Sequence, residues 1–421
     1  MANAQASGGS FREVFASVYL PTTVYETGIG AVTPVIPLLA IELGGSPALA
    51  AGVMALLGIG QVIGDIPAGH LAARLGDRKA MLYGTLVTLG VLIACALAPH
   101  WTVLAAGVFL LGMVNALFVL ARQAYLTEVT PPLRRSRALS TMGGMQRMGA
   151  LVGPFLGGAV MSLLATSGHD NLRAAFWLAV ALALVTGLVV YLVPEIDAPG
   201  RVAASHTKTS HLLRDNWRMF ATLGVAFILV GAVRQTRSIV LPLWSDDSGL
   251  SASVTSYIFG LSGLLDVALF YPGGRLMDKR GRLWVGIPSM MILGGSLLAL
   301  PFMHAAGTIA VVAILMGLGN GIGAGILMTI GADLAPTATR AQFLSLTRMF
   351  ADSGGGVGPL VVAGGAALGA LGGGIALMGV AGFAAAAIFA VYLPRYSVHA
   401  NRHTRIAAGL TPQGAEIHQI E

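Results

Sequence analysis

The stretch GALVGPFLGG at residues 149–158 returns near the other end of the chain as GGGVGPLVVAGG at 354–365. Both copies place glycine, three residues, glycine and proline inside an otherwise apolar run. An offset of 205 residues superposes the two copies, and it also aligns further landmarks: Pro37 with Pro242, Gly69 with Gly274, Gly76 with Gly281, Glu128 with Asp333, Pro131 with Pro336 and Arg135 with Arg340. One offset that holds in helices and loops predicts two repeated halves with the same orientation.

The composition places this repeat in a membrane. Hydrophobic residues make up 55% of the chain and charged residues only 10%, against roughly 25% charged in an ordinary soluble domain. Apolar runs of about twenty residues, long enough to cross a bilayer, recur with short polar breaks. They predict twelve transmembrane helices: 18–41, 49–72, 80–98, 102–124, 139–163, 172–193, 220–243, 254–273, 284–302, 308–332, 341–367 and 372–393.

Lysine and arginine residues gather in every second loop. They follow the even-numbered spans, whereas the opposite loops carry Arg173 and little else. By the positive-inside rule, both termini should face the cytoplasm. The membrane is expected to be the cell membrane, that is, the inner or plasma membrane. We therefore predict an all-α integral membrane protein with two pseudo-symmetric six-helix bundles at 1–193 and 220–394, a cytoplasmic linker at 194–219 and a cytoplasmic tail at 395–421. The net charge of +7 then reflects topology and not nucleic-acid binding.

The sequence gives little support for other functional classes. The lone Cys95 gives no disulfide framework, and the glycine runs lack the lysine and hydroxyl residue of a nucleotide-binding loop. We expect no enzyme, no metal site and no cofactor, with an ion gradient as the energy source. A single chain that contains both halves needs no protein partner, so a monomer that binds a small-molecule substrate within the lipid bilayer is expected.

The loop GRLMDKRGR at 274–282 resembles the loop signature of the major facilitator superfamily: glycine, any, leucine, any, aspartate, basic, any, glycine, arginine. Its first-half counterpart, GHLAARLGD at 69–77, keeps the glycines and Arg74 but has Ala73 in place of the aspartate and Asp77 in place of the last arginine. The resemblance covers almost the whole chain. It implies a secondary transporter in which two bundles rock about a central cavity.

The stretch at 149–158 resembles the fifth-helix signature that this superfamily associates with drug/proton antiporters. That resemblance implies export of amphipathic small molecules in exchange for protons. Within the stretch, Gly149, Gly153 and Gly157 lie on one helix face, which allows close approach of another backbone, and Pro154 can bend the helix. We expect these residues, with Gly358 and Pro359 in the second copy, to serve gating, although plain packing is the alternative.

The loop signatures are expected to latch the cytoplasmic side. Asp278, Lys279 and Arg282 can dock against helix ends or against Glu128 and Arg122. The first-half latch, which lacks a carboxylate at position 73, should be weaker or use Asp77. The same predicted group includes further positions: Asp65, Gly69, Arg74, Arg78, Gly274 and Asp333. The alternative is that these charges only orient the protein.

Ionisable residues inside spans are costly in lipid and therefore suggest function. Glu26 lies in the middle of the first span beside Tyr25. Because a buried carboxyl group can take up and release a proton as its partners change, we predict that Glu26 couples transport to protons, with Asp266 and Asp352 as further proton sites. The alternative for Glu26 is a structural ion pair with an arginine of the fifth or seventh span.

The remaining span charges predict a substrate site. Arg147 lies about 200° round its helix from Gly149 and should face the cavity. It aligns with Asp352 in the repeat, so the two could bridge the cavity, although a local pair of Asp352 with Arg348 is favoured.

Arg234 and Arg237 share a face of the seventh span, with Gln235 beside them. We assign these three residues, Arg147 and Tyr25 to substrate binding. Two arginines suit a carboxylate or phosphate, so transport of an organic anion or metabolite is the rival function. Neutralisation of the arginines by Glu26 and Asp266 is the structural alternative.

Overall fold

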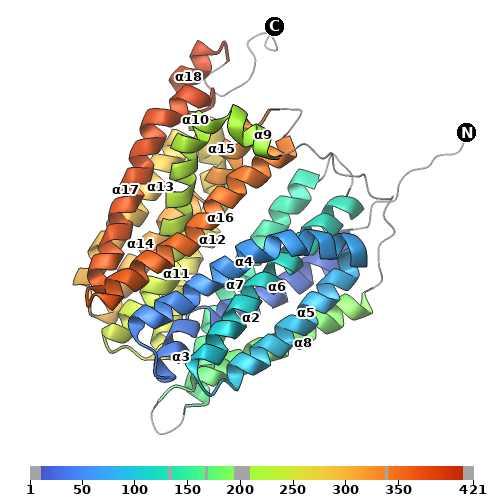
Figure 1. Cartoon of the computed structure of the whole chain (residues 1–421), viewed down its shortest axis with the longest axis vertical. Coiled ribbons are helices and arrows are strands. Elements are labelled where there is room, and N and C mark those ends of the chain that lie inside the picture. The colour runs from blue at the N-terminus through green and yellow to red at the C-terminus, as the bar shows by residue number, and fades with distance from the viewer. Residues whose placement is uncertain (1–10, 131–134, 166–168, 194–208, 337–339, 411–421) are drawn as a thin grey trace, which may run out of the picture.

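The computed structural model describes residues 11–130, 135–165, 169–193, 209–336 and 340–410. We call each membrane-crossing unit, which consists of one helix or of several consecutive helices, a rod. The first six predicted spans form six rods, which together make the first half (Figure 1). In chain order its helices are α1 (Phe11–Val14), the π-helix η1 (Phe15–Tyr19), α2 (Leu20–Val32), α3 (Ile36–Glu42), α4 (Pro47–Leu75), α5 (Asp77–Ala96), α6 (Trp101–Val129), α7 (Arg135–Leu163) and α8 (Leu172–Leu192). The first rod therefore runs from α1 through α3.

The second half repeats this order. Its helices are α9 (Thr209–Asp215), α10 (Trp217–Met219), η3 (Phe220–Gly224), α11 (Val225–Asp247), α12 (Ala252–Arg280), α13 (Leu283–Ala299), η4 (Leu300–Phe302), α14 (Ala306–Ile322), α15 (Ile326–Leu334), α16 (Arg340–Ala367), α17 (Leu371–Tyr396) and α18 (Arg402–Ala407). The predicted all-α fold with twelve membrane-crossing rods is confirmed. The exact domain limits stay a prediction, and residues 194–208 of the linker lie outside the described residues.

Ten of the rods are long and apolar enough to cross a bilayer by length and composition alone. The other two, α7 and α16, are as long as their neighbours. They carry the charged residues Arg147, Arg348 and Asp352 together with the glycine-rich repeat, which lowers their mean hydropathy. The two rods outside this group of ten are thus the two that hold the repeated stretch.

The turn after α4 and the turn after α12 have similar backbone conformations. Gly76 and Gly281, which are equivalent in the repeat, both adopt a positive φ, of 82° and 102°. Side chains rarely tolerate this region, whereas glycine enters it freely. Gly76 and Gly281 therefore end one helix and set the direction in which the next helix begins.

The glycine face of α7 packs against α2, and that of α16 packs against α11. A methyl group on Gly149 or Gly153 would collide with the carbonyl oxygen of Thr23 or Thr27. In the second half, Gly354 and Gly358 stand in the same way against the carbonyls of Ile228 and Ala232, which are the repeat equivalents of Thr23 and Thr27. The internal repeat is therefore preserved in single contacts. Both α7 and α16 continue as helices through Pro154 and Pro359.

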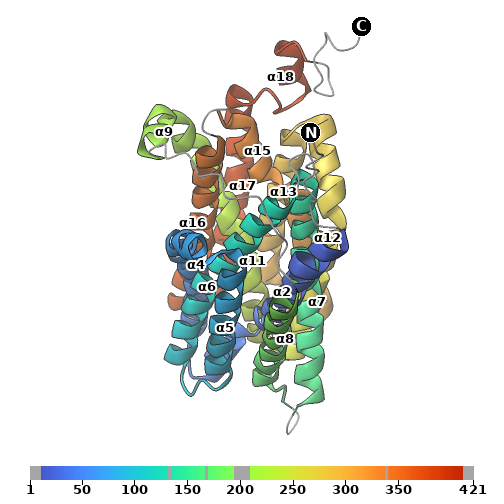
Figure 2. The same cartoon turned by 90° about the vertical axis from the view of Figure 1, so that its right-hand side faces the viewer.

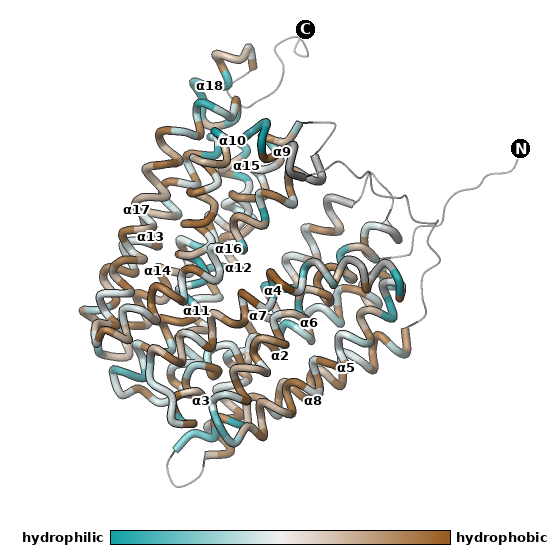
Figure 3. The backbone as a smooth tube through the Cα atoms, viewed as in Figure 1, coloured by the Kyte–Doolittle hydropathy of each residue, from teal (hydrophilic) through white to brown (hydrophobic). Residues whose placement is uncertain are grey.

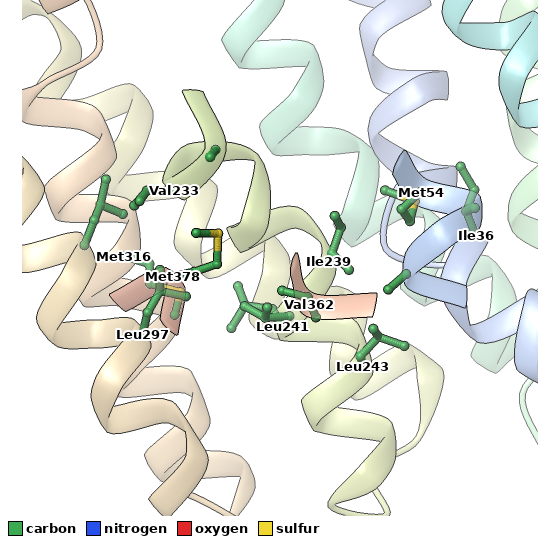
Figure 4. Close-up of a cluster of buried hydrophobic side chains, with 14 of the residues drawn as sticks. Ile36, Met54, Val233, Ile239, Leu241, Leu243, Leu297, Met316, Val362 and Met378 are labelled. Atoms are coloured by element: carbon green, nitrogen blue, oxygen red, sulfur yellow. The ribbon is translucent and has the colours of Figure 1, made fainter. Parts of the chain in front are cut away.

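The two halves meet along α4 with α16 and along α7 with α12. Their ribbons lie close near α3 and diverge toward α9 and α18 (Figure 1). On the α3 side one apolar cluster joins the halves, because Ile36 and Met54 belong to the same core as Ile239 and Leu243 of α11 (Figure 4). The rods are apolar along most of their length, with hydrophilic residues concentrated toward their ends and in the middle of the molecule (Figure 3).

Candidate functional site

Arg147 extends from α7 into the seam with α12. Because the glycine face of α7 is packed on α2, Arg147 lies on the side that faces the other half. Its Nη1 donates to Oδ1 of Asp266 at 2.6 Å, and its guanidinium carbon lies 4.7 Å from the centre of the Phe270 ring. The side chains keep 26% and 12% exposure. This ion pair connects the two halves inside the membrane span.

Asp266 is the centre of a polar network in the second half. Its Oδ2 accepts from Nδ2 of Asn320 at 2.8 Å and from Nη2 of Arg237 at 3.4 Å. Arg237 also donates through Nη1 to the Ser262 hydroxyl at 3.1 Å. One buried carboxylate is therefore shared between an arginine of each half.

Arg234 lies next to this network. It donates to the carbonyl oxygen of Gly323, its charged neighbours are Arg147, Asp266 and Arg237, and its buried Nε has no hydrogen-bond partner among the described residues. We call Arg147, Arg234, Arg237 and Asp266 the central charge cluster. Three arginines face one aspartate, so the cluster has an excess of two positive charges. Gln235, between the two α11 arginines, is half-buried.

Glu26 forms a separate pair inside the first half. Its Oε1 accepts from Nη2 of Arg122 in α6 at 3.1 Å and from Nε2 of Gln146 in α7 at 3.4 Å. The Arg122 side chain is fully buried and lies 5.2 Å from the Phe118 ring centre. The arginine that pairs with Glu26 is therefore in the fourth rod and not in the fifth or seventh. Neutralisation of Arg234 by Glu26 does not occur here.

Two predicted assignments need correction because of this packing. Arg122 does not reach the loop at 274–282, since it is enclosed with Glu26. Tyr25 is 2% exposed, stacks on Phe118 at 4.2 Å and packs with α5 and α6. Successive residues of an α-helix point about 100° apart around its axis. Tyr25 therefore points in a different direction from Glu26, and its ring lies in the interior of the first half. This placement argues against direct contact between Tyr25 and a substrate.

The seam of α4 with α16 is the repeat counterpart of the seam of α7 with α12. Asp352 accepts from Nε of Arg348 at 3.3 Å, which is the local pair that the spacing favours. No bridge to Arg147 forms. Asp65 of α4 has Arg348 and Asp352 as its charged neighbours, and Gly58 of α4 faces the backbone of Gly355. Asp65 therefore belongs to the seam and not to the loop latch where the sequence placed it.

The loop signature of the second half binds within its own half. Arg282 donates through Nε and Nη2 to the Asp333 carboxylate at 2.8 and 3.2 Å, and through Nη1 to Asp278 at 3.2 Å. Arg405 of α18 donates to the carbonyls of Asp278 and Lys279 at 2.9 and 3.2 Å. Burial, and the nearby charge of Arg282, lower the pKa of Arg405. The predicted contact of this loop with Arg122 is not formed. The side chain of Glu128, the other predicted partner, lies outside the described residues.

In the first-half loop, too, a basic side chain binds a partner within its own half. Arg78 donates to the carbonyls of Val190 and Tyr191 at 3.2 and 2.8 Å, where a cation stabilises the end of α8. Arg74 is exposed. A close helix crossing occurs at Gly273, which faces the carbonyl of Ile322, whereas Gly274, a member of the predicted latch group, has open space beside it. The side chains of Asp77 and Glu128, and contacts at Gly69, lie outside the described residues.

Sequence reasoning missed Asn320, Gln146 and Phe270. Asn320 had a usable signal, because it is the one amide in the apolar run GLGNGIG and polar groups inside spans indicate function. Gln146 carried the same signal, as an amide inside the fifth span, whereas Phe270 had none, since only the packing of the halves brings it to Arg147.

Several known proteins are similar to this chain. The uncharacterised MFS-type transporter YdgK of Bacillus subtilis (strain 168) is 25% identical over 314 residues, which covers 73% of this chain and 76% of YdgK. The multidrug resistance protein MdtH of Klebsiella pneumoniae (strain 342) is 24% identical over 339 residues, which covers 79% of this chain and 81% of MdtH.

The fold is also shared with a solved transporter. A bacterial homolog to the human lysosomal transporter Spinster, in an inward-facing and unoccupied conformation, superposes with a TM-score of 0.72 at 15% identity, over 90% of this chain and 97% of that one. Residues 19–359 match the family model of the Major Facilitator Superfamily. The protein therefore belongs to the Major Facilitator Superfamily, as a multi-pass membrane transporter and not an enzyme.

Proposed function

We propose that this transporter exports amphipathic small molecules in exchange for protons, by rocking its two halves about the central charge cluster. The observation that carries the proposal is the carboxylate of Asp266, which is held between Arg147 of the first half and Arg237 of the second. A proton on this carboxylate removes its charge and weakens its attraction to both arginines. Proton binding would therefore favour separation of α7 from α12, and proton release would favour their contact.

Asp266 suits proton exchange better than Glu26. A proton on Glu26 would leave the fully buried Arg122 without a counter-charge, which is costly in a low-dielectric interior. A proton on Asp266 leaves Arg147 and Arg237, whose side chains are 26% and 16% exposed, so these arginines can be solvated or bind a substrate group. We assign the exchange first to Asp266, with Glu26 and Asp352 as secondary sites.

The contact between halves supports the direction of exchange. The halves touch on the α3 side with an ionised bridge between Arg147 and Asp266. If the basic loops face the cytoplasm, this is an inward-facing state without a coupling proton. Such a state is the one in which an exporter loads its cargo from inside. The cell or inner membrane, cytoplasmic termini and a monomeric unit are parts of this proposal.

The amphipathic cargo is suggested by the relatives and by the seam. MdtH and other similar proteins are named for multidrug resistance. At the seam, Phe155 stacks on Tyr257 of the other half at 6.3 Å, and Phe270 covers Arg147. Aromatic faces next to charges suit molecules with an apolar body and a polar group.

The test uses purified protein in liposomes that contain a pH-sensitive dye. An imposed proton gradient should dissipate when a lipophilic compound is added, and Asp266→Asn should abolish this coupled flux. Asp247→Asn, an exposed carboxylate at the end of α11, is the matched control and should behave as the wild type. Coupled flux at the wild-type rate in Asp266→Asn would overturn the assignment.

A second function is favoured by the charge excess of the cluster. Three arginines against one aspartate would repel cations and attract a carboxylate or phosphate. Proton-coupled transport of an organic anion is therefore the alternative. Arg234→Gln should abolish transport of anions in this case, whereas it should only broaden selectivity in an exporter of amphipathic compounds. The same liposomes, challenged in turn with lipophilic cations and organic anions, separate the two functions.

A further inference from the structure

A groove on the outer face of the first half takes no part in the central charge cluster. It lies between α5 and α8, which run side by side (Figure 2). Its volume is about 530 Å³, and its lining is almost entirely apolar: Lys79, Leu82, Tyr83, Thr85, Leu86, Leu89, Ala183, Leu184, Gly187, Leu188 and Tyr191. Neither helix contributes a residue to the cluster.

The walls of the groove are built for a hydrocarbon chain. Leu86 and Leu188 are 60% and 56% exposed although they lie within membrane-spanning helices. Gly187 leaves the floor open, since a methyl group there would meet only the Thr85 methyl at 3.4 Å. Because the groove faces outward from both membrane spans, the molecules that can reach it laterally are lipids and lipid-dissolved compounds.

One end of the groove carries a positive charge. Lys79 is exposed in the first turn of α5, and Tyr83 follows one turn later. Tyr191, which is 69% exposed, lies in the last turn of α8. Tyrosine is typical of the membrane interface, and a lysine at this depth attracts anionic headgroups. The neighbouring Arg78 is already bonded to the α8 carbonyls, so Lys79 is the base that this end offers to a ligand.

We propose that the groove binds an anionic phospholipid, with one acyl chain between α5 and α8 and the headgroup phosphate at Lys79. The charge selects the headgroup and the apolar walls hold the chain. Lipid binding here requires only that α5 and α8 span the membrane, so it stands independently of the substrate and of proton coupling.

Native mass spectrometry of the purified, delipidated transporter tests the proposal. Titration with phosphatidylglycerol should give a bound lipid at lower concentration than titration with phosphatidylcholine of the same chains. Lys79→Ala should weaken phosphatidylglycerol binding by about fivefold, the factor expected for one base at a membrane surface, and weaken phosphatidylcholine binding less, because choline offsets the charge of its phosphate. Arg395→Ala, which removes a base from the last turn of α17, is the charge control.

A second variant tests the groove itself. Gly187→Phe fills the floor and should reduce binding of both lipids, whereas Gly90→Phe places the same ring on an exposed part of α5 outside the lining. Equal phosphatidylglycerol binding by wild type and Lys79→Ala, or unchanged binding in Gly187→Phe with native helical content, would overturn the proposal. A groove covered by a second copy of the chain would also overturn it, and would appear as a dimer mass lost in Gly187→Phe. Complete displacement of phosphatidylglycerol by inorganic phosphate alone would show that the apolar walls hold no chain, and would also overturn the proposal.

Discussion

At the scale of single residues, the acidic residues Glu26, Asp266 and Asp352 inside the spans each pair with an arginine. Arg122 is fully buried and depends on Glu26 for its counter-charge, while Asp266 is shared by Arg147 and Arg237. Glu26 with Arg122 and Arg147 with Asp266 could not be predicted, because each pair joins helices that are distant in the chain. Arg348 and Asp352, four residues apart in one helix, were predictable as a pair, and the pair of Arg237 with Asp266 was one part of the structural alternative.

The enclosed pair gives a stability prediction. Glu26→Gln leaves the Arg122 guanidinium buried without a counter-charge, so the transporter should be destabilised by about 3–5 kcal/mol. The thermal midpoint in detergent should fall clearly. Adding Arg122→Met should recover most of the loss, because the uncompensated charge is then gone. An unchanged midpoint in Glu26→Gln would show that Arg122 finds water or another partner.

At the scale of elements, the glycine-rich helices α7 and α16 act as closely packed rods. The sequence predicts their glycine faces, and the repeat predicts that both copies pack alike. It does not indicate which helix each face meets. The packing of α7 on α2 follows from the carbonyl positions of Thr23 and Thr27, which depend on the fold. Tyr25 was misplaced for the same reason, since helical spacing gives a face but not its neighbour.

Matched glycine substitutions test this packing. Gly149→Ala and its equivalent Gly354→Ala both direct a methyl group at a backbone carbonyl, so each should lower the thermal midpoint and the transport rate. Gly143→Ala on the same α7 helix meets open space and should be neutral or stabilising by about 0.5–1 kcal/mol, because alanine favours helix. Equal behaviour of Gly143→Ala and Gly149→Ala would contradict the close packing of α7 on α2.

A cross-link between elements tests whether the α7 and α12 seam must open. The Cβ of Leu151 would lie 3.9 Å from a Cβ at Gly263 in the other half, which fits disulfide geometry. In a Cys95→Ala background, Leu151→Cys with Gly263→Cys should oxidise readily and stop transport, and a reductant should restore it. Either cysteine alone is the control. Continued transport by the cross-linked protein would exclude separation of this seam.

At the scale of the whole molecule, the repeat, the composition and the loop signatures were sufficient to predict the fold. A single 205-residue offset relates the glycine turns at Gly76 and Gly281 and the seams on both sides of the molecule. The site was less predictable, because repeated positions carry different chemistry. Arg147 and Asp352 are equivalent in sequence, yet one pairs across the halves and the other within its helix. Which pairs form depends on how the halves stand in this state.

The most direct measurement is the distance between the halves on the α3 side as a function of pH. In a Cys95→Ala background, spin labels at the exposed Ser162 of α7 and Asp247 of α11 report this distance. At high pH, ionised Asp266 binds Arg147 and a short distance should dominate; at low pH a longer one should appear. Asp266→Asn should show the longer distance at every pH. One unchanged distance in both proteins across the pH range would contradict proton-controlled rocking.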